Sequence, residues 1–384
     1  MQPTRTNYST PSDDVLSVAL ELSTSSWKIA LQDGKRENPT IKTVNAEIPE
    51  HRLQQLIDEI ERVRSKWALA SETRTVVLYE AGQDGFWIAR ALARLGIEAL
   101  VCDPASIQVS RHARRAKTDR LDAIKLVNSL RRWLAGERDC MRVIRQPSVE
   151  AEAQRHHVRD RGELQKEAMQ HRDRIRKLLR TVGCWDSADG DIAGRLAHGE
   201  LRAYGGAALP LQLRDRLQRE CQRLALVEQQ FAVIEKELIK QLPAPVQERA
   251  AKLQRLKAVG KVGAVRLVLE LFWRRFQNRR QVGACVGLVP QPYDSGNSHA
   301  DQGISKQGNR RVRSLLIEMA WFWLRYQPGS TISRWYAQRI GDGKSKRGKR
   351  VAIVAVARRL VIALWRYLEH DVVPDGAALK LQRN

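Results

Sequence analysis

The chain has 384 residues, 43% of them hydrophobic, with 67 lysines and arginines against 43 aspartates and glutamates, a formal net charge of +24. This length suits two or three domains, and the apolar fraction excludes a largely disordered protein. Because a cationic surplus of this size repels itself unless a polyanion is present, DNA or RNA is the expected partner. Residues 1–100 hold two more acidic than basic side chains, whereas residues 301–384 hold eleven more basic than acidic.

The cysteines and the apolar segments exclude other classes. The five cysteines lie far apart, without a CxxC pair, so neither a zinc site nor a disulfide framework is predicted, and a reduced cytoplasmic protein is expected. No apolar run approaches the ~20 residues that span a bilayer, so no membrane partner is predicted.

Residues 1–145 predict an α/β domain. Apolar residues alternate in two strands, 15–22 and 27–32, around a turn at 23–26. The elements expected after this hairpin are a strand at 41–48, a helix with apolar residues between 53 and 63, a strand at 75–79, a helix at 86–95, a strand at 97–102 and a helix at 115–134. A hairpin followed by alternating helices and strands implies a mixed sheet flanked by helices.

The remainder of the chain predicts two helical domains. In residues 146–250, the segments 148–182 and 211–242 are long, charged and poor in glycine and proline. This pattern is typical of an antiparallel coiled-coil hairpin and, as much, of a plain helical spacer. Residues 251–384 predict a mainly α C-terminal domain with a loop at 290–308 and an apolar helix at 351–368.

Four carboxylates form a candidate metal site. Glu21 lies on the first strand, opposite the face of its alternating leucines, and Glu80 follows the strand at 75–79. Asp119 and Asp122 are three residues apart, so a helix projects both from one face. Brought together at one sheet edge, such charges require cations, and oxygen-only ligands suit Mg²⁺ or Mn²⁺.

The alternative interpretation of these acids is ordinary surface charge. A single carboxylate is more often solvated than functional. Asp119 and Asp122 can form ion pairs with Lys117, Arg120 and Lys125 on their own helix. Asp103, at the end of the strand 97–102, is a rival candidate, although the following proline favours a loop-capping role.

Two parts of the chain resemble one protein family. Residues 79–123, which include AKTDRLDA at 116–123, resemble the nuclease domain of the DEDD transposases of bacterial insertion sequences, a RuvC-like group with the RNase H fold. Residues 256–271 and 276–321, including ISKQGNRRVR at 304–313, resemble the C-terminal domain of the same family. The resemblance covers most of the chain, in the family's order and spacing.

The resemblance implies an RNase H-like N-terminal domain whose acids, Glu21, Glu80, Asp119 and Asp122, hold divalent ions. Two Mg²⁺ or Mn²⁺ ions would clamp the attacking and leaving oxygens of a phosphodiester. The family's first acid is normally aspartate within a G-I-D-like strand, whereas this chain reads A-L-E, which lengthens the side chain by one methylene.

The resemblance also places a serine nucleophile at Ser295, in YDSGNS at 293–298. Taken alone, this segment predicts a turn. Nearby cations are expected to bind phosphates or offset transition-state charge, namely Lys306, Arg310, Arg311 and Arg313.

Further features are typical of nucleic-acid binding. Gly260, Lys261 and Gly263 fit a helix-hairpin-helix turn that presents backbone N–H groups to a phosphate, although such a turn serves packing as often. Lys344, Lys346 and Arg347 begin a basic run for which phosphate contact is expected. Four tryptophans are more typical of core positions than of base stacking, namely Trp321, Trp323, Trp335 and Trp365.

The predicted function is that of a transposase or site-specific DNA recombinase of an insertion sequence. The resemblance implies donor and target DNA, a noncoding guide RNA, and a homo-oligomer, dimer or tetramer, with composite active sites, acting in the cytoplasm on nucleoid DNA. One alternative is a junction-resolving nuclease that uses only the acids and water. The other is a catalytically degenerate nucleic-acid-binding protein, which Glu21 favours.

Overall fold

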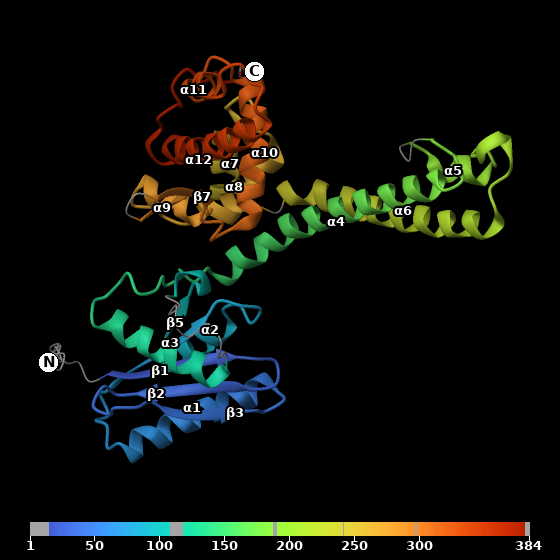
Figure 1. Cartoon of the computed structure of the whole chain (residues 1–384). Coiled ribbons are helices and arrows are strands. Elements are labelled where there is room, and N and C mark those ends of the chain that lie inside the picture. The colour runs from blue at the N-terminus through green and yellow to red at the C-terminus, as the bar shows by residue number, and fades with distance from the viewer. Residues whose placement is uncertain (1–14, 108–117, 187–189, 241, 296–297, 381–384) are drawn as a thin grey trace. The chain divides into compact units, whose positions relative to one another are not determined.

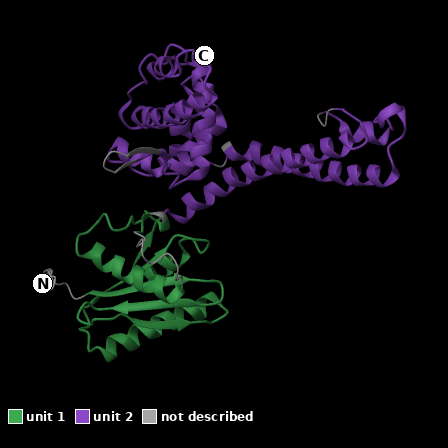
Figure 2. Ribbon diagram, viewed as in Figure 1, with its two compact units in different colours: residues 1–146 green, residues 147–384 purple. Residues whose placement is uncertain are grey.

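The chain folds as two compact units, residues 1–146 and 147–384 (Figure 2). The computed structural model describes residues 15–107, 118–186, 190–240, 242–295 and 298–380. Among the described residues, no helix has both the length and the apolar character needed to cross a membrane.

The first unit is built on a five-stranded mixed sheet with the strand order β3-β2-β1-β4-β5. The strands are β1 (Val15–Leu22), β2 (Trp27–Gln32), β3 (Thr40–Val44), β4 (Arg74–Glu80) and β5 (Glu98–Cys102). β2 pairs antiparallel with both β1 and β3, whereas β1, β4 and β5 are parallel. Antiparallel strands are joined by a short turn, but parallel strands need helical crossovers, as the sequence pattern predicted. The mixed sheet is thereby confirmed.

Helices cover both faces of this sheet (Figure 1). α1 (Pro49–Lys66) and α2 (Trp87–Arg94) pack on the face that carries Leu16, Val18 and Leu20. α3 (Asp119–Leu134) packs on the other face, where Ala19 is fully buried. The small side chain of Ala19 lets the α3 backbone approach β1, so a larger residue there would overpack the interface, typically at about 1–3 kcal/mol.

The second unit begins with a long helical arm. α4 (Val149–Arg180) and α6 (Leu211–Lys240) run alongside each other, with the short α5 (Ile192–Ala197) between them in sequence (Figure 1). Their shared core is apolar and includes Ile175, Leu179 and Leu217. Cross-helix ion pairs flank it, such as Arg161–Glu235 at 2.5 Å. The predicted helical hairpin is therefore present.

The rest of this unit is a helical C-terminal core. Its elements are α7 (Ala244–Gln254), α8 (Lys261–Leu267), a π-helical turn (Val268–Phe272), α9 (Arg279–Cys285), β6 (Pro290–Ser295), β7 (Ser298–Ile304), α10 (Arg310–Tyr326), α11 (Thr331–Ile340) and α12 (Lys346–His370). The buried helix α12, which contains Val356, Leu360 and Leu364, packs on α10 and α11. The prediction of a loop at 290–308 was wrong, because most of it forms the antiparallel β6–β7 hairpin.

Candidate functional site

The first candidate site lies where the parallel strands of the first unit end. Leu20 pairs with Tyr79, so the next residues, Glu21 and Glu80, are neighbours on adjacent strands. Adjacent strands lie about 4.8 Å apart. Glu21 and Glu80 share the alternation of Ala19 and Leu78, whose side chains pack under α3. Both acids therefore occupy the face that α3 covers.

The thiol of Cys102 lies in the electric field of this edge. Cys102 pairs with Glu80 across β4 and β5 and is fully buried. Burial, followed by the negative charges of Glu80, Asp103 and Glu21, raises the pKa of the Cys102 thiol to about 12. Glu21, Glu80 and Asp103 thus all lie near the Cys102 thiol.

The two aspartates of α3 lie at the same edge. Arg131, near the end of α3, lies against Gly34, where an added Cβ would come within 2.8 Å of the guanidinium. Gly34 follows β2, and β2 runs antiparallel to β1, so the end of α3 lies near the start of β1. The start of α3 therefore lies where β1 and β4 end. Asp119 and Asp122 occupy its first turn, behind the Thr118 cap, which accepts a hydrogen bond from Leu121.

Asp119, which is exposed, and Asp122, which is half-buried, lie on the same side of α3 as its buried residues. Ala123 and Leu126 pack on the sheet one turn further along, and residues three and four apart share a helix face. Within the described part of the chain, neither aspartate forms an ion pair with Arg120 or Lys125, while Lys117 lies outside the described residues. The surface ion pairs considered as the alternative are thus absent among the described residues.

These acids suit a divalent cation in their chemistry. The donors are all carboxylate oxygens, which Mg²⁺ and Mn²⁺ prefer. Among the described residues, however, no group of three or more potential ligands is arranged to hold a metal ion. The rival Asp103 forms an ion pair with Arg142 at 3.4 Å, and its backbone carbonyl accepts a hydrogen bond from Ser106.

The predicted nucleophile lies in the other unit. Ser295 is the last residue of β6 and pairs with Ser298 of β7, but its side chain lies outside the described part of the structure. Two of the predicted phosphate-binding residues form hydrogen bonds with the segment between α9 and β6. Lys306 adopts a left-handed conformation, and its backbone N–H donates to Gly287. Arg313 donates to the carbonyl of Val286 at 3.0 Å.

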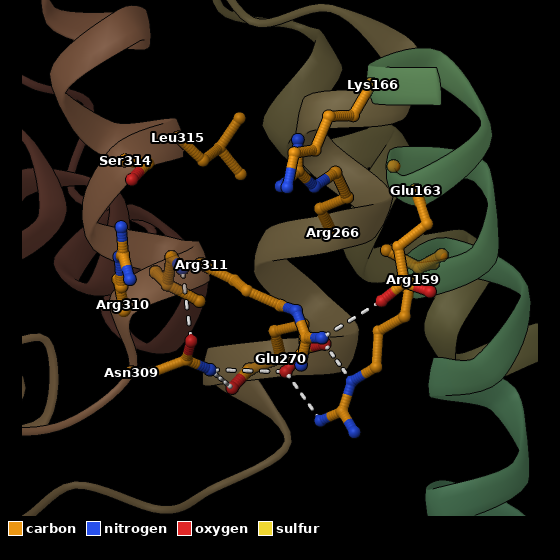
Figure 3. Close-up of a pocket in the computed structure, with 13 residues that line it drawn as sticks. Arg159, Glu163, Lys166, Arg266, Glu270, Asn309, Arg310, Arg311, Ser314 and Leu315 are labelled. Carbon is orange, nitrogen blue, oxygen red and sulfur yellow. Dashed lines mark hydrogen bonds and ion pairs between the residues drawn. The ribbon is translucent and has the colours of Figure 1, made fainter. Parts of the chain in front are cut away.

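The other two predicted cations, Arg310 and Arg311, line a basic pocket of about 590 Å³ (Figure 3). Its walls come from α4, from α8 with the π-helical turn, and from the start of α10. Besides these two arginines, the charged lining residues are Arg159, Lys166 and Arg266, with Glu163 and Glu270 as the acids. The cations outnumber the acids, so the pocket attracts anions.

Glu270 connects the three walls of this pocket. It is buried on the π-helical turn, where Arg159 of α4 donates to both carboxylate oxygens at 2.8 and 3.2 Å. Asn309, the cap of α10, donates to Glu270 at 3.2 Å and accepts from Val312 (Figure 3). Burial alone would raise the pKa of Glu270, but the hydrogen bond and charge of Arg159, with Asn309 and Arg155, hold it below its usual range.

Arg266 extends into the same pocket without an ion pair or hydrogen bond in the described part of the chain. Burial lowers the pKa of its guanidinium, and the carboxylate of Glu318 only partly offsets this. Lys166 likewise has no such partner among the described residues. Sequence reasoning missed Arg159, Arg266 and Glu270. The available signal was Glu270 itself, a single acid within the apolar run 267–272, where a buried charge requires a cation.

The helix-hairpin-helix residues serve two different purposes. Gly263 packs at 3.7 Å from the sulfur of Met319, measured to an added Cβ, which fits the packing interpretation. Gly260 is the cap residue of α8 and has open space around it, and Lys261 is exposed. The basic run is also exposed: Lys344 precedes α12, and Lys346 and Arg347 lie in its first turn.

Of the four tryptophans, two occupy the predicted core positions and two do not. Trp323 and Trp365 are buried, whereas Trp321 is exposed. Trp335 is half-buried and lies beneath Arg359, whose guanidinium carbon is 4.1 Å from the ring centre.

An acidic sheet edge in one unit and a basic pocket in the other are together typical of a protein that processes nucleic acid. The family model of the IS116/IS110/IS902 transposases matches residues 250–335. Over 376 residues and 94% of both proteins, the chain is 39% identical to y4rJ of Sinorhizobium fredii, a transposase by name. The transposase for insertion sequence element IS1111A of Coxiella burnetii is 27% identical over 76% of this chain and 77% of its own length.

The chain therefore belongs to the IS116/IS110/IS902 family of transposases. A transposase of an insertion sequence transfers DNA strands, so DNA is its substrate. The recognised family is the one that the motifs indicated, at the level of insertion-sequence transposases.

Proposed function

We propose that the chain is a metal-dependent recombinase with an RNase H-like first unit, in which Glu21, Glu80, Asp119 and Asp122 hold divalent ions. The observation that carries the proposal is the register of β1 and β4, which makes Glu21 and Glu80 neighbours at the edge where α3 begins. The hairpin followed by parallel strands supports the RNase H-like assignment. Two ions, Mg²⁺ or Mn²⁺, supply Lewis-acid stabilisation of charge on a phosphodiester.

The nucleophile in this proposal is Ser295. Its hydroxyl oxygen bonds to phosphorus, the bond from phosphorus to one sugar oxygen breaks, and that oxygen takes up a proton as a free hydroxyl. The serine proton passes to a base, because a hydroxyl is a weak nucleophile until it is deprotonated. A strand's free hydroxyl then attacks the phosphoserine and releases Ser295, so rejoining needs no external energy source.

The remaining finer assignments follow from the family resemblance. The acids and Ser295 meet in composite sites within a homo-oligomer, a dimer or tetramer, and a noncoding RNA selects donor and target DNA in the cytoplasm. The basic surplus of +24 supports a nucleic-acid partner in addition to duplex DNA. The added methylene of Glu21 favours the degenerate alternative, because a displacement of about 1 Å matters at a catalytic site.

The test is adduct formation on element-end DNA, with the cognate RNA and Mg²⁺. The wild-type chain is expected to form a denaturation-resistant protein–DNA adduct, which Ser295→Ala abolishes. Glu80→Gln is expected to slow cleavage on the order of a thousandfold, because it removes a ligand charge. Glu98→Gln is the matched control, since Glu98 is an exposed acid at the start of β5, at the opposite edge of the same sheet.

Each result separates the alternatives. An adduct that persists in Ser295→Ala contradicts the serine assignment, and cleavage without any adduct identifies the nuclease. Absence of cleavage by the wild-type chain, together with cleavage by Glu21→Asp, identifies the degenerate protein. Equal losses in Glu80→Gln and Glu98→Gln contradict the acidic site.

A further inference from the structure

A second basic concavity lies in the C-terminal core, and its lining residues include none of those that the sequence analysis predicted to bind nucleic acid. It is about 700 Å³ in volume and lies between α9, α11, α12 and residues 372–375. We name it the arginine groove, after its five basic lining residues, Arg279, Arg280, Arg358, Arg359 and Arg366. Among the described residues that line the groove, Asp375 is the single acid.

The arginines of α12 are spaced to follow an extended ligand. Arg359, Ile362 and Arg366 lie on one face of α12, because residues three, four and seven apart coincide on a helix. Arg359 and Arg366 are seven residues apart, which corresponds to about 10.5 Å along the helix. One strand of a duplex carries a charge every ~3.4 Å of its axis, so this interval spans roughly three phosphates.

The cations of the groove are not neutralised from within the described chain. None of the five arginines forms an ion pair with a described acid. The carboxylate of Asp375 instead accepts a hydrogen bond from the hydroxyl of Thr331 at 2.7 Å. Arg358 has a buried Nε without a hydrogen-bond partner, a costly state that a bound anion can relieve only if it reaches this nitrogen.

Trp335, on the α11 wall of the groove, helps to hold Arg359 in position. The guanidinium of Arg359 lies over the ring of Trp335, 4.1 Å from its centre. A stacked guanidinium is held in place by its π-face and keeps its N–H edge available, which reduces the side-chain entropy lost on binding. Apolar residues such as Ile362 and Ala363 line the space between the arginines.

We propose that the arginine groove binds the phosphodiester backbone of a nucleic-acid strand. The inference rests on the chain's action on nucleic acid but needs neither the acids of the first unit nor Ser295. The stacked position of Arg359, the lack of ion pairs between the five arginines and any described acid, and the hydrogen bond that already engages Asp375 match a polyanion. DNA and RNA share this chemistry, so the experiment distinguishes the two sources.

The experiment measures binding by the full chain in EDTA, where strand cleavage does not interfere. The probes are labelled duplex DNA, single-stranded DNA and single-stranded RNA of one sequence, each titrated at several salt concentrations. The variant is Arg359→Gln with Arg366→Gln, both exposed residues on α12. The matched control is Arg216→Gln with Arg219→Gln, which removes the same charge from exposed positions on α6.

The groove variant is expected to bind its probe about tenfold more weakly and to lower the slope of log K against log salt by about two, since each lost phosphate contact lowers it by about one. The control is expected to change affinity less than twofold, with melting temperatures of both variants unchanged. The probe that loses affinity identifies the strand as DNA or RNA.

Two outcomes overturn the proposal. One is an equal loss in groove and control variants, which reflects net charge alone. The other is unchanged affinity and salt slope on all three probes. If Ser295→Ala and Glu80→Gln fail to alter cleavage while the groove variant loses affinity, the catalytic proposal fails and the groove stands.

Discussion

The helical arm and the arginine groove are both rich in arginine, but several arginines of the arm form ion pairs across its two helices. On the arm, Arg161 pairs with Glu235, Arg172 with Glu228 and Arg174 with Glu220. In the groove, the five arginines have no ion pair with any described acid. Local composition therefore does not identify a phosphate-binding surface. The decisive property is whether the fold supplies acids to the cations.

This difference has an electrostatic basis. Paired charges about 3 Å apart cancel at distances beyond the Debye length of about 8 Å, so the arm projects little field toward a polyanion. Unpaired cations in a concavity reinforce one another, because the low-dielectric walls focus their field. The net charge of +24 is therefore expected to act mainly through the C-terminal core.

The largest expected effect concerns the ion pair between Arg159 and the buried Glu270. Glu270→Gln removes the carboxylate that Arg159 contacts twice and that offsets most of the charge of the buried Arg155. Removing one member of a buried pair costs about 3–5 kcal/mol, and the lower end applies because the Arg159 side chain is 33% exposed. Urea unfolding of the full chain measures the loss. A loss below about 1 kcal/mol contradicts a structural role for the pair.

The pH dependence of this effect has a definite sign. The pKa of Glu270 is lowered in the folded chain, so its stabilisation is complete above the unfolded pKa near ~4.3 and is lost as pH falls through the lower folded value. Glutamine does not titrate. The stability difference between the wild-type chain and Glu270→Gln is thus expected to be constant near neutrality and to narrow below about pH 4. A difference that widens on acidification contradicts the assignment.

A smaller effect is expected on the arm. Glu220 is buried and accepts hydrogen bonds from Arg174 and Arg223, with His171 at 2.7 Å. Burial would raise its pKa, but His171 and Arg174 lower it overall. Glu220→Gln is expected to cost about 1–2 kcal/mol, less than Glu270→Gln, because the two arginines stay solvated. Thermal unfolding measures the loss, and binding of nucleic acid is expected to change less than twofold.

Much of the first unit was predictable because its signals are local. The strands at 15–22 and 27–32 have the observed bounds, and the alternation of Leu16, Val18 and Leu20 gave the correct buried face. The edge position of Glu80 follows from the same strand pattern. The position of the start of α3 beside that edge depends on how the helices cross over between parallel strands. The alternation of strands and helices in the sequence predicted these crossovers.

The features that were not predictable depend on contacts distant in sequence. Arg159 and Glu270 are 111 residues apart, so no local pattern joins them. The β6–β7 hairpin was expected to be a loop, since its sequence contains two prolines and two glycines, and its cross-strand pairing outweighs that local preference. The arginine groove is formed by residues of α9 and α12, which are far apart in the sequence. The sequence instead indicated a phosphate-binding role for the continuous charge run that includes Lys344, Lys346 and Arg347.

The smallest expected effect provides the sharpest comparison, because the substitution Glu163→Gln converts a paired arginine, Arg311, into an unpaired one. Glu163 and Arg311 form an exposed pair at 3.3 Å at the basic pocket, with side chains 62% and 53% exposed. Glu163→Gln is expected to change stability by less than about 0.5 kcal/mol. If pairing with acids is what withholds an arginine from phosphate, the same variant binds nucleic acid about twofold more tightly at low salt, and the gain disappears at high salt. Glu167→Gln, one turn further along α4 and also exposed, is the control for the change in net charge. An equal gain in both variants means that net charge, rather than release of Arg311, sets the affinity.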